Sequence, residues 1–206
     1  MARIDRPPPG EELNLGEATE PRLAATAILL RDGSEGLEVL LVQRNPEQRF
    51  MGGAWVFPGG AVHSDDAGPE AAALRELEEE AGMRIEDVAE LVPFSRWITP
   101  VEVKIRFDTF FYVAATPPDA EPRVDGAECV DFRWIGPADA LAAGQRGELM
   151  LVFPTIKHLE QLAEFESVEH ALSEARSRDV RPILPKVVHG DGEAHVLLPG
   201  EPGYPE

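Results

Sequence analysis

Residues 70–83 read Glu-Ala-Ala-Ala-Leu-Arg-Glu-Leu-Glu-Glu-Glu-Ala-Gly-Met, and this stretch decides much of the fold of the chain. Pro69 suits the first turn of a helix, because that position needs no backbone N–H donor. The residues that follow are good helix formers, and Gly82 is typical of the glycine just past a helix end. The stretch therefore predicts a helix over residues 70–81.

Three acidic side chains share one face of this helix. At about 100° per residue, Glu76, Glu79 and Glu80 point in similar directions. They repel one another, so such a face lies in solvent or holds cations. A solvated face is the usual alternative for a glutamate-rich run, but Leu74 and Leu77 supply an apolar side that would fix the direction of the acids. Oxygen ligands without a His/Cys cluster suit Mg²⁺ or Mn²⁺.

A glycine pair precedes the helix, in Phe57-Pro58-Gly59-Gly60. Paired glycines permit close approach of the backbone to a ligand. Together the two segments resemble the Nudix box, and residues 75–83 match every specified position of its second half. The first half differs, because the loop is one residue longer than usual. The acidic residue that holds the box arginine in the family falls on Asp65 or Asp66, each a shortened stand-in for glutamate.

The resemblance implies a fold and a reaction. The fold is a Nudix-type α/β/α sandwich with a mixed central sheet, and the reaction is attack of a metal-activated water on a diphosphate phosphorus. It implies that Mg²⁺ or Mn²⁺ is bound and that the following residues form the site: Glu76, Glu79 and Glu80 as metal ligands, Arg75 as the residue that orients the glutamates, and Gly59 and Gly60 as the loop beside the substrate.

The general base in this family is often a glutamate outside the helix. Glu128, just before an expected strand at 130–135, is our candidate for this catalytic role or for a further metal ligand. The alternative is a solvated loop acid beside Asp125. Glu102 is a weaker second candidate.

The substrate must be inferred from residues outside the box. Residues 40–60 are similar to the signature of coenzyme A diphosphatases, and residues 96–111 resemble the peroxisomal branch of these enzymes and its bacterial relatives. Coenzyme A or acyl-coenzyme A is therefore the expected substrate. Hydrolysis of ADP-ribose, NADH or dinucleoside polyphosphates is the alternative. A nucleotide-sensing module without activity is disfavoured, because all three box glutamates are present.

Four side chains upstream and downstream of the box are candidate substrate contacts. Arg44 and Arg49 suit bidentate binding of phosphates, although surface ion pairs would explain them equally well. Phe50 and Trp97 would sandwich an adenine ring, although aromatic residues in strands more often belong to the core. We expect three further phenylalanines in the core or in a dimer interface: Phe107, Phe110 and Phe111.

Composition bounds the partners of the chain. Its 206 residues carry a formal net charge of −19, which argues against binding to nucleic acid or to anionic membranes but not against a small nucleotide in a local cationic site. Cys129 is the one cysteine, so no intrachain disulfide forms and a reducing, cytoplasmic location is expected. We find no signal peptide or membrane-spanning run.

The hydrophobic pattern predicts one main domain. We expect a flexible lead over residues 1–20, a Nudix hydrolase domain over 21–180, and a hairpin or arm over 181–206. The two helices at 154–178 and the last segment would support a homodimer or cap the substrate cleft. The predicted strands and helices are strands at 23–30, 37–43, 55–57, 90–98, 106–115 and 130–135, and helices at 70–81, 137–143, 154–165 and 168–178.

Overall fold

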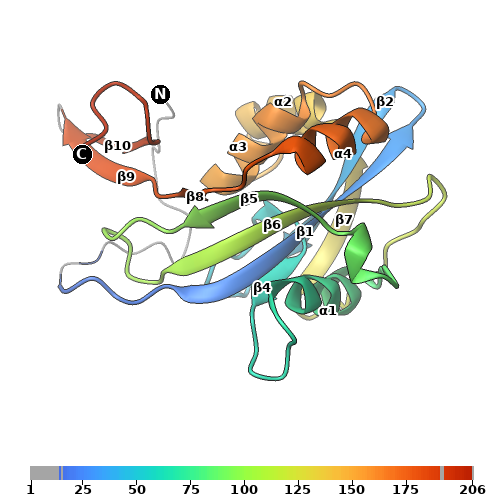
Figure 1. The fold of residues 1–206 in the computed structure, drawn as a ribbon, viewed down its shortest axis with the longest axis horizontal. Helices are drawn as coiled ribbons and strands as arrows, with labels where there is room; N and C mark the ends of the chain where they lie inside the picture. The colour runs from blue at the N-terminus through green and yellow to red at the C-terminus, as the bar shows by residue number, and fades with distance from the viewer. Residues whose placement is uncertain (1–13, 15, 191–192, 206) are drawn as a thin grey trace.

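A mixed β-sheet forms the centre of the molecule (Figure 1). The computed structural model describes residues 14, 16–190 and 193–205, so most of the expected flexible lead lies outside the described residues. Six strands follow the order β3-β2-β1-β6-β5-β8, while β4 pairs with β1 and β7 pairs with β2. The strands are β1 (Arg22–Gly33), β2 (Gly36–Arg44), β3 (Trp55–Val56), β4 (Gly59–Ala61), β5 (Val92–Ile98), β6 (Phe107–Ala115), β7 (Cys129–Ile135) and β8 (Pro182–Ile183).

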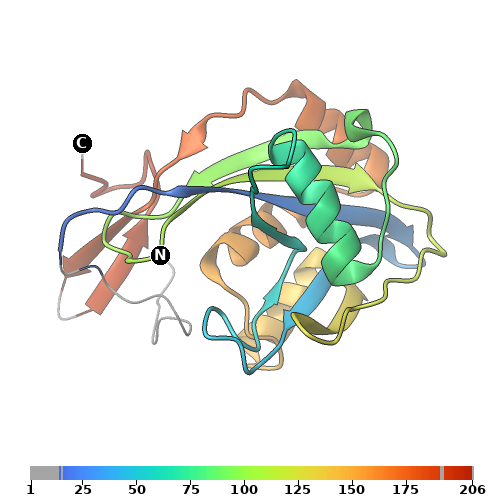
Figure 2. The same ribbon diagram turned by 90° about the horizontal axis from the view of Figure 1, so that it is seen from below.

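Helices cover both faces of this sheet (Figures 1 and 2). One apolar cluster joins α1 to the sheet, and a second joins the sheet to α2, α3 and α4 on the opposite face. This arrangement confirms the expected α/β/α sandwich. The helices are α1 (Pro69–Ala81), α2 (Pro137–Gln145), α3 (Phe153–Leu162), α4 (Val168–Ser177) and the short 3₁₀ helix η1 (Val88–Glu90).

The central strand β1 divides its side chains between the two layers. Ala27 and Leu29 belong to the cluster under α1, whereas Ile28 and Leu30 belong to the cluster under α2–α4. This alternation follows from the two-residue period of a strand. Because both faces are covered, the strand reads as a continuous apolar run rather than as an alternating pattern.

Beyond β1 the sheet divides. The first half of β1 pairs with β4, with Thr26 opposite Gly59, whereas its last residues pair with β2, with Leu30 opposite Val39. We expected residues 59–60 to be a loop, and this was wrong, because they form β4. A Cβ on Gly59 would overlap the Thr26 hydroxyl oxygen and the β1 backbone. Glycine therefore allows this strand to lie close against β1.

The ends of α1 follow the sequence signals. Pro69 occupies the first turn, and Gly82 adopts the left-handed conformation with φ of 62°. The Gly82 N–H donates to the Glu78 carbonyl oxygen at 2.9 Å. Both features fix where the helix begins and ends, and so they fix which way its glutamates point.

The last segment forms an antiparallel hairpin of β9 (Lys186–Gly190) and β10 (Glu193–Leu197) outside the main sheet. Figure 2 shows this hairpin at the end of the sheet away from α1. Buried Leu197 and a hydrogen bond of 2.7 Å from the Tyr204 hydroxyl to the Leu184 carbonyl oxygen hold it in place. None of the helices in the described part of the chain has the length and hydropathy needed to cross a bilayer.

Candidate active site

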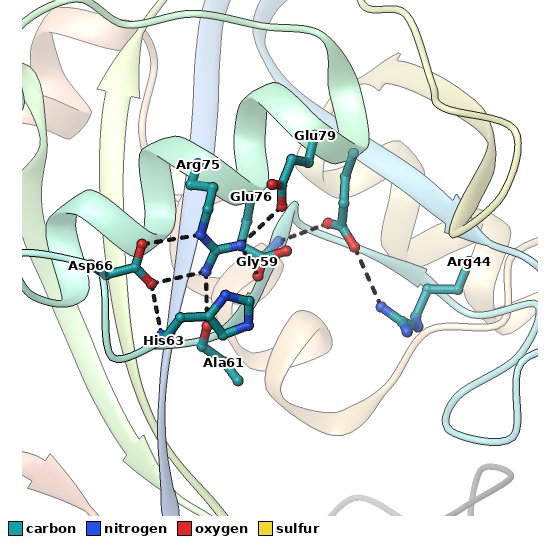
Figure 3. A network of polar contacts seen from close by, with 9 residues as sticks. Arg44, Gly59, Ala61, His63, Asp66, Arg75, Glu76 and Glu79 are labelled. Carbon is teal, nitrogen blue, oxygen red and sulfur yellow. Dashed lines mark hydrogen bonds and ion pairs between the residues drawn. The ribbon is translucent and has the colours of Figure 1, made fainter.

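Arg75 organises the acidic side chains around α1 (Figure 3). Its Nε and Nη2 atoms donate to the two oxygens of Asp66 at 3.1 and 3.0 Å. Its Nη1 atom donates to Glu76 at 2.8 Å and to Glu79 at 2.9 Å, and Nη2 also reaches the Ala61 carbonyl oxygen at 3.0 Å. One guanidinium thus joins the loop before the helix, strand β4 and two helix glutamates.

Asp66 is the acidic partner of this arginine. Its Oδ2 atom also accepts the His63 N–H at 2.7 Å, which fixes the turn of the loop. The hydrogen bonds from Arg75 lower the pKa of Asp66 to about 2. Asp65, the other residue that the spacing allowed, accepts the Ser64 hydroxyl instead. The longer loop therefore keeps the contact to Arg75 through Asp66.

Glu80 lies where the sheet divides, between the end of β2 and the start of β4. The Gly59 N–H donates to its Oε2 atom at 2.9 Å, and Arg44 Nη1 lies 3.5 Å from its Oε1 atom. Burial raises the pKa of Glu80 to about 7, although Gly59 and Arg44 act in the opposite direction. The carboxylate is held in place by a backbone donor and a cation in a position that disfavours its charge.

Glu76 and Glu79 differ in their exposure. The Glu76 side chain is 10% exposed, and burial raises its pKa. A Cβ on Gly60 would overlap the Glu76 carboxylate, so a glycine is needed there. The Glu79 side chain is 59% exposed. The helix thus presents one carboxylate beside β4 and another at the open side of the site.

The donor atoms of these carboxylates are of the type that binds a hard divalent cation. They supply only oxygen donors, and their crowding contributes to the raised pKa of Glu80, a cost that a cation would relieve. Within the described ranges, however, three or more acidic, histidine or cysteine side chains are not gathered into a ready metal cluster. Arg75 and the Gly59 N–H occupy their oxygens instead.

The carboxylates line a large cavity of about 790 Å³. Glu128 lines it as well, and its charge raises the pKa of both Glu76 and Glu80, which places it near them. The two Asp125 oxygens accept the Glu128 N–H at 3.1 and 2.9 Å and hold this residue at the start of β7. Glu102 is not among the cavity-lining residues.

Three of the four predicted substrate contacts line the cavity, and Arg49 does not. Arg44 and Phe50 line the cavity, and the Arg44 Nε atom donates to the Phe50 carbonyl oxygen at 3.4 Å. Trp97 also lines it but is 4% exposed and packs edge-on against Phe153. Arg49 is exposed and is not among the lining residues. The substrate roles of these residues stay predictions.

Phe107 and Arg22 are among the cavity residues that sequence reasoning missed. Phe107, which we expected in the core or in a dimer interface, lines the cavity with its ring centroid 5.8 Å from that of Phe50. Arg22, at the start of β1, lines it too. The two-residue period of a strand places Phe107, Thr109 and Phe111 on one face, but it does not reveal that this face lines a cavity.

Comparison with known proteins agrees with this geometry. Residues 20–152 match the family model described as "NUDIX domain". The putative nudix hydrolase 7 of Caenorhabditis elegans is 26% identical over 92% of this chain and 77% of its own length. The acyl-coenzyme A diphosphatase NUDT19 of Gallus gallus is 30% identical over 60% of this chain, which spans only 35% of that protein.

A solved structure shows the same fold. The NUDIX hydrolase of Alicyclobacillus acidocaldarius superposes with a TM-score of 0.65 at 29% identity, covering 75% of this chain and 96% of that one. The match to the family model covers more than half of the chain and includes the whole of α1, with Glu76, Glu79 and Glu80. The chain therefore belongs to the Nudix hydrolase superfamily.

Proposed function

We propose that the chain hydrolyses the diphosphate bond of coenzyme A or of an acyl-coenzyme A. The observation that carries the proposal is that a single cavity joins the carboxylates of α1 to an aromatic and aliphatic region. A substrate with a charged diphosphate in its middle and a long apolar arm matches that distribution. The products would be 3′,5′-ADP and a phosphopantetheine.

The charged part of the cavity supplies the hydrolytic groups. Glu76, Glu79 and Glu80 would hold Mg²⁺ or Mn²⁺, which when bound lowers the pKa of water and neutralises charge on phosphoryl oxygens. Arg75 orients Glu76 and Glu79 through its Nη1 atom. Glu128, which lines the same cavity just before β7, would accept the proton of the attacking water on its carboxylate.

The apolar part of the cavity supports a substrate with a long arm. Val103 and Ile105 come from the β5–β6 loop, and Val187 and Val196 come from the β9–β10 hairpin. The volume of about 790 Å³ lies in the range of ligand sites that enclose a molecule of several hundred daltons. The chicken relative described as an acyl-coenzyme A diphosphatase supports the same substrate class.

A substrate panel tests the proposal. Purified protein with Mg²⁺ or Mn²⁺ would be given coenzyme A, an acyl-coenzyme A, ADP-ribose, NADH and a diadenosine polyphosphate, with products identified by mass. Hydrolysis in ¹⁸O-labelled water identifies the attacked phosphorus. If coenzyme A stays intact while ADP-ribose, NADH or the dinucleotide is cut, the substrate assignment is wrong. Tight binding without cleavage would indicate a sensing module instead.

The hairpin bears on the expected quaternary structure. Its contribution of Val187 and Val196 to the cavity wall favours a role in covering the substrate. The homodimer stays a prediction, which light scattering of the full chain tests.

A further inference from the structure

Three arginines line the cavity, and the guanidinium groups of two of them are already paired with other groups of the protein. Arg75 binds Asp66, Glu76 and Glu79, and Arg44 lies against Glu80 and the Phe50 carbonyl oxygen. Arg22 lines the same cavity and is exposed, and among the described residues its guanidinium has neither an ion pair nor a hydrogen bond. An unpaired cation facing a cavity of a strongly acidic chain is available to an anionic ligand.

The sheet fixes where Arg22 lies relative to the carboxylates. Strands β1 and β6 pair in parallel, with Arg22 beside Phe107 and Thr26 beside Phe111, and all four side chains line the cavity. Thr26 lies opposite Gly59, whose N–H binds Glu80. Thr26 is four residues further along the strand than Arg22, which is a distance of about 13 Å along the floor of the cavity.

Aromatic rings accompany this cation. Phe107, the sheet neighbour of Arg22, has its ring centroid 5.8 Å from that of Phe50, with the rings tilted by 55°. The pair lines the cavity as half-buried side chains. An aromatic surface beside a free guanidinium matches a nucleotide that carries a phosphate on its ribose, because bases pack on aromatic rings and guanidinium groups bind phosphate through two donors.

We propose that Arg22 binds a second phosphate of the substrate, the one on the ribose 3′ position of coenzyme A, while the adenine packs against Phe107 and Phe50. The inference rests on the proposed function and assigns the residue that would separate coenzyme A from nucleotides without this phosphate. Arg22 is a binding residue that lies away from the α1 carboxylates, so its effect falls on KM rather than on kcat.

The test compares two substrates that differ only in this phosphate. With coenzyme A, Arg22→Gln raises KM about tenfold or more and leaves kcat unchanged. With 3′-dephospho-coenzyme A, the same variant behaves like the unmodified protein. Arg22→Lys, which keeps the charge but loses the two-donor geometry, gives an intermediate KM. The control is Arg146→Gln, a change at an exposed arginine outside the cavity. It leaves KM and kcat unchanged with both substrates.

A binding measurement separates this inference from the proposed function. Calorimetry with 3′,5′-ADP and 5′-AMP reports on Arg22 even if the unmodified protein cleaves neither coenzyme A nor its dephospho form. The unmodified protein is expected to bind 3′,5′-ADP more tightly, and Arg22→Gln is expected to bind both equally. The inference is overturned if Arg22→Gln keeps the preference, or if it weakens both ligands and both substrates to the same extent.

Discussion

Asp66 and Arg75 form a bidentate ion pair, in which both carboxylate oxygens lie within 3.1 Å of guanidinium nitrogens. The pair ties the loop before α1 to the helix, although the loop is one residue longer than the family pattern and carries an aspartate in place of a glutamate. The extra loop residue compensates for the shorter side chain. The orientation of Glu76 and Glu79 depends on this pair, because the same guanidinium binds all three acids.

Asp66→Asn should therefore lower activity. The amide keeps the size of the side chain but loses the charge, and Arg75 is then free to turn away from Glu76 and Glu79. We expect kcat to fall about 10- to 100-fold, as is typical when the residue behind a metal ligand is replaced. The matched control is Asp65→Asn, which removes the charge of a side chain that contacts Ser64 rather than Arg75, and its kcat should stay within about twofold. Equal losses in the two variants would contradict the role of Asp66.

Glu79→Gln should abolish most of the activity. In the proposed mechanism Glu79 holds the metal, so its loss removes several kcal/mol of transition-state stabilisation, and we expect kcat/KM to fall about 10³-fold. Glu78→Gln is the adjacent control, because Glu78 pairs with Arg84 and does not line the cavity. If the Glu78 variant were as inactive as the Glu79 variant, activity would depend on the total negative charge of α1 and not on which face of the helix carries the glutamate.

Gly60→Ala and Gly59→Ala should separate activity from stability. The three atoms nearest to a Cβ added at residue 60 all belong to the Glu76 carboxylate, which can move, so activity falls while the free energy of unfolding changes by less than about 1 kcal/mol. The Cβ added at residue 59 meets the backbone of β1, and we expect a loss of about 1–3 kcal/mol. Urea denaturation and steady-state kinetics on both variants check this. The reverse pattern would contradict it.

His158 should make the fold sensitive to acid. Its ring is fully buried, Nδ1 donates to the Pro154 carbonyl oxygen at 2.6 Å, and Nε2 accepts the Ser95 hydroxyl at 2.6 Å. Burial lowers its pKa from 6.5 to about 4. As pH falls below 6.5 the unfolded chain takes up this proton first, so stability present at neutral pH is lost, by roughly 2 kcal/mol between pH 6.5 and pH 5.

Urea denaturation at several pH values measures this effect. His158→Met should be less stable at pH 7, because Ser95 loses its partner, yet should show a smaller loss of stability between pH 6.5 and pH 5. The control is His170→Gln on the exposed side of α4, which should keep the pH dependence of the unmodified protein. An unchanged pH dependence in the His158 variant would assign the acid sensitivity to other groups.

The sequence was sufficient where the signals are local. Helical spacing alone placed Glu76, Glu79 and Glu80 on one side of α1, and the glycine after the helix marked its end. The choice between Asp65 and Asp66 required the loop conformation, because either carboxylate was within reach by count. Strand β4 carries no hydrophobic pattern, since its glycines are there to fit against Thr26 and Glu76.

The far part of the cavity could not be predicted for a different reason. Arg22 and Phe107 meet because β1 and β6 pair in parallel, and that pairing joins segments far apart in the chain. Each residue alone is an ordinary surface arginine or strand phenylalanine. Likewise, the sequence did not indicate that Trp97, which lines the cavity, also packs against Phe153 and His158.

The β9–β10 hairpin follows the residues that match the family model, which end at 152, yet Val187 and Val196 form part of the cavity wall. The α1 carboxylates and this wall are thus encoded in separate stretches of the gene. Mutations in the hairpin can change which molecules fit the cavity without altering the α1 carboxylates. The range of substrates can therefore change in evolution while the proposed hydrolytic groups are conserved. The same separation offers protein engineers a segment to exchange.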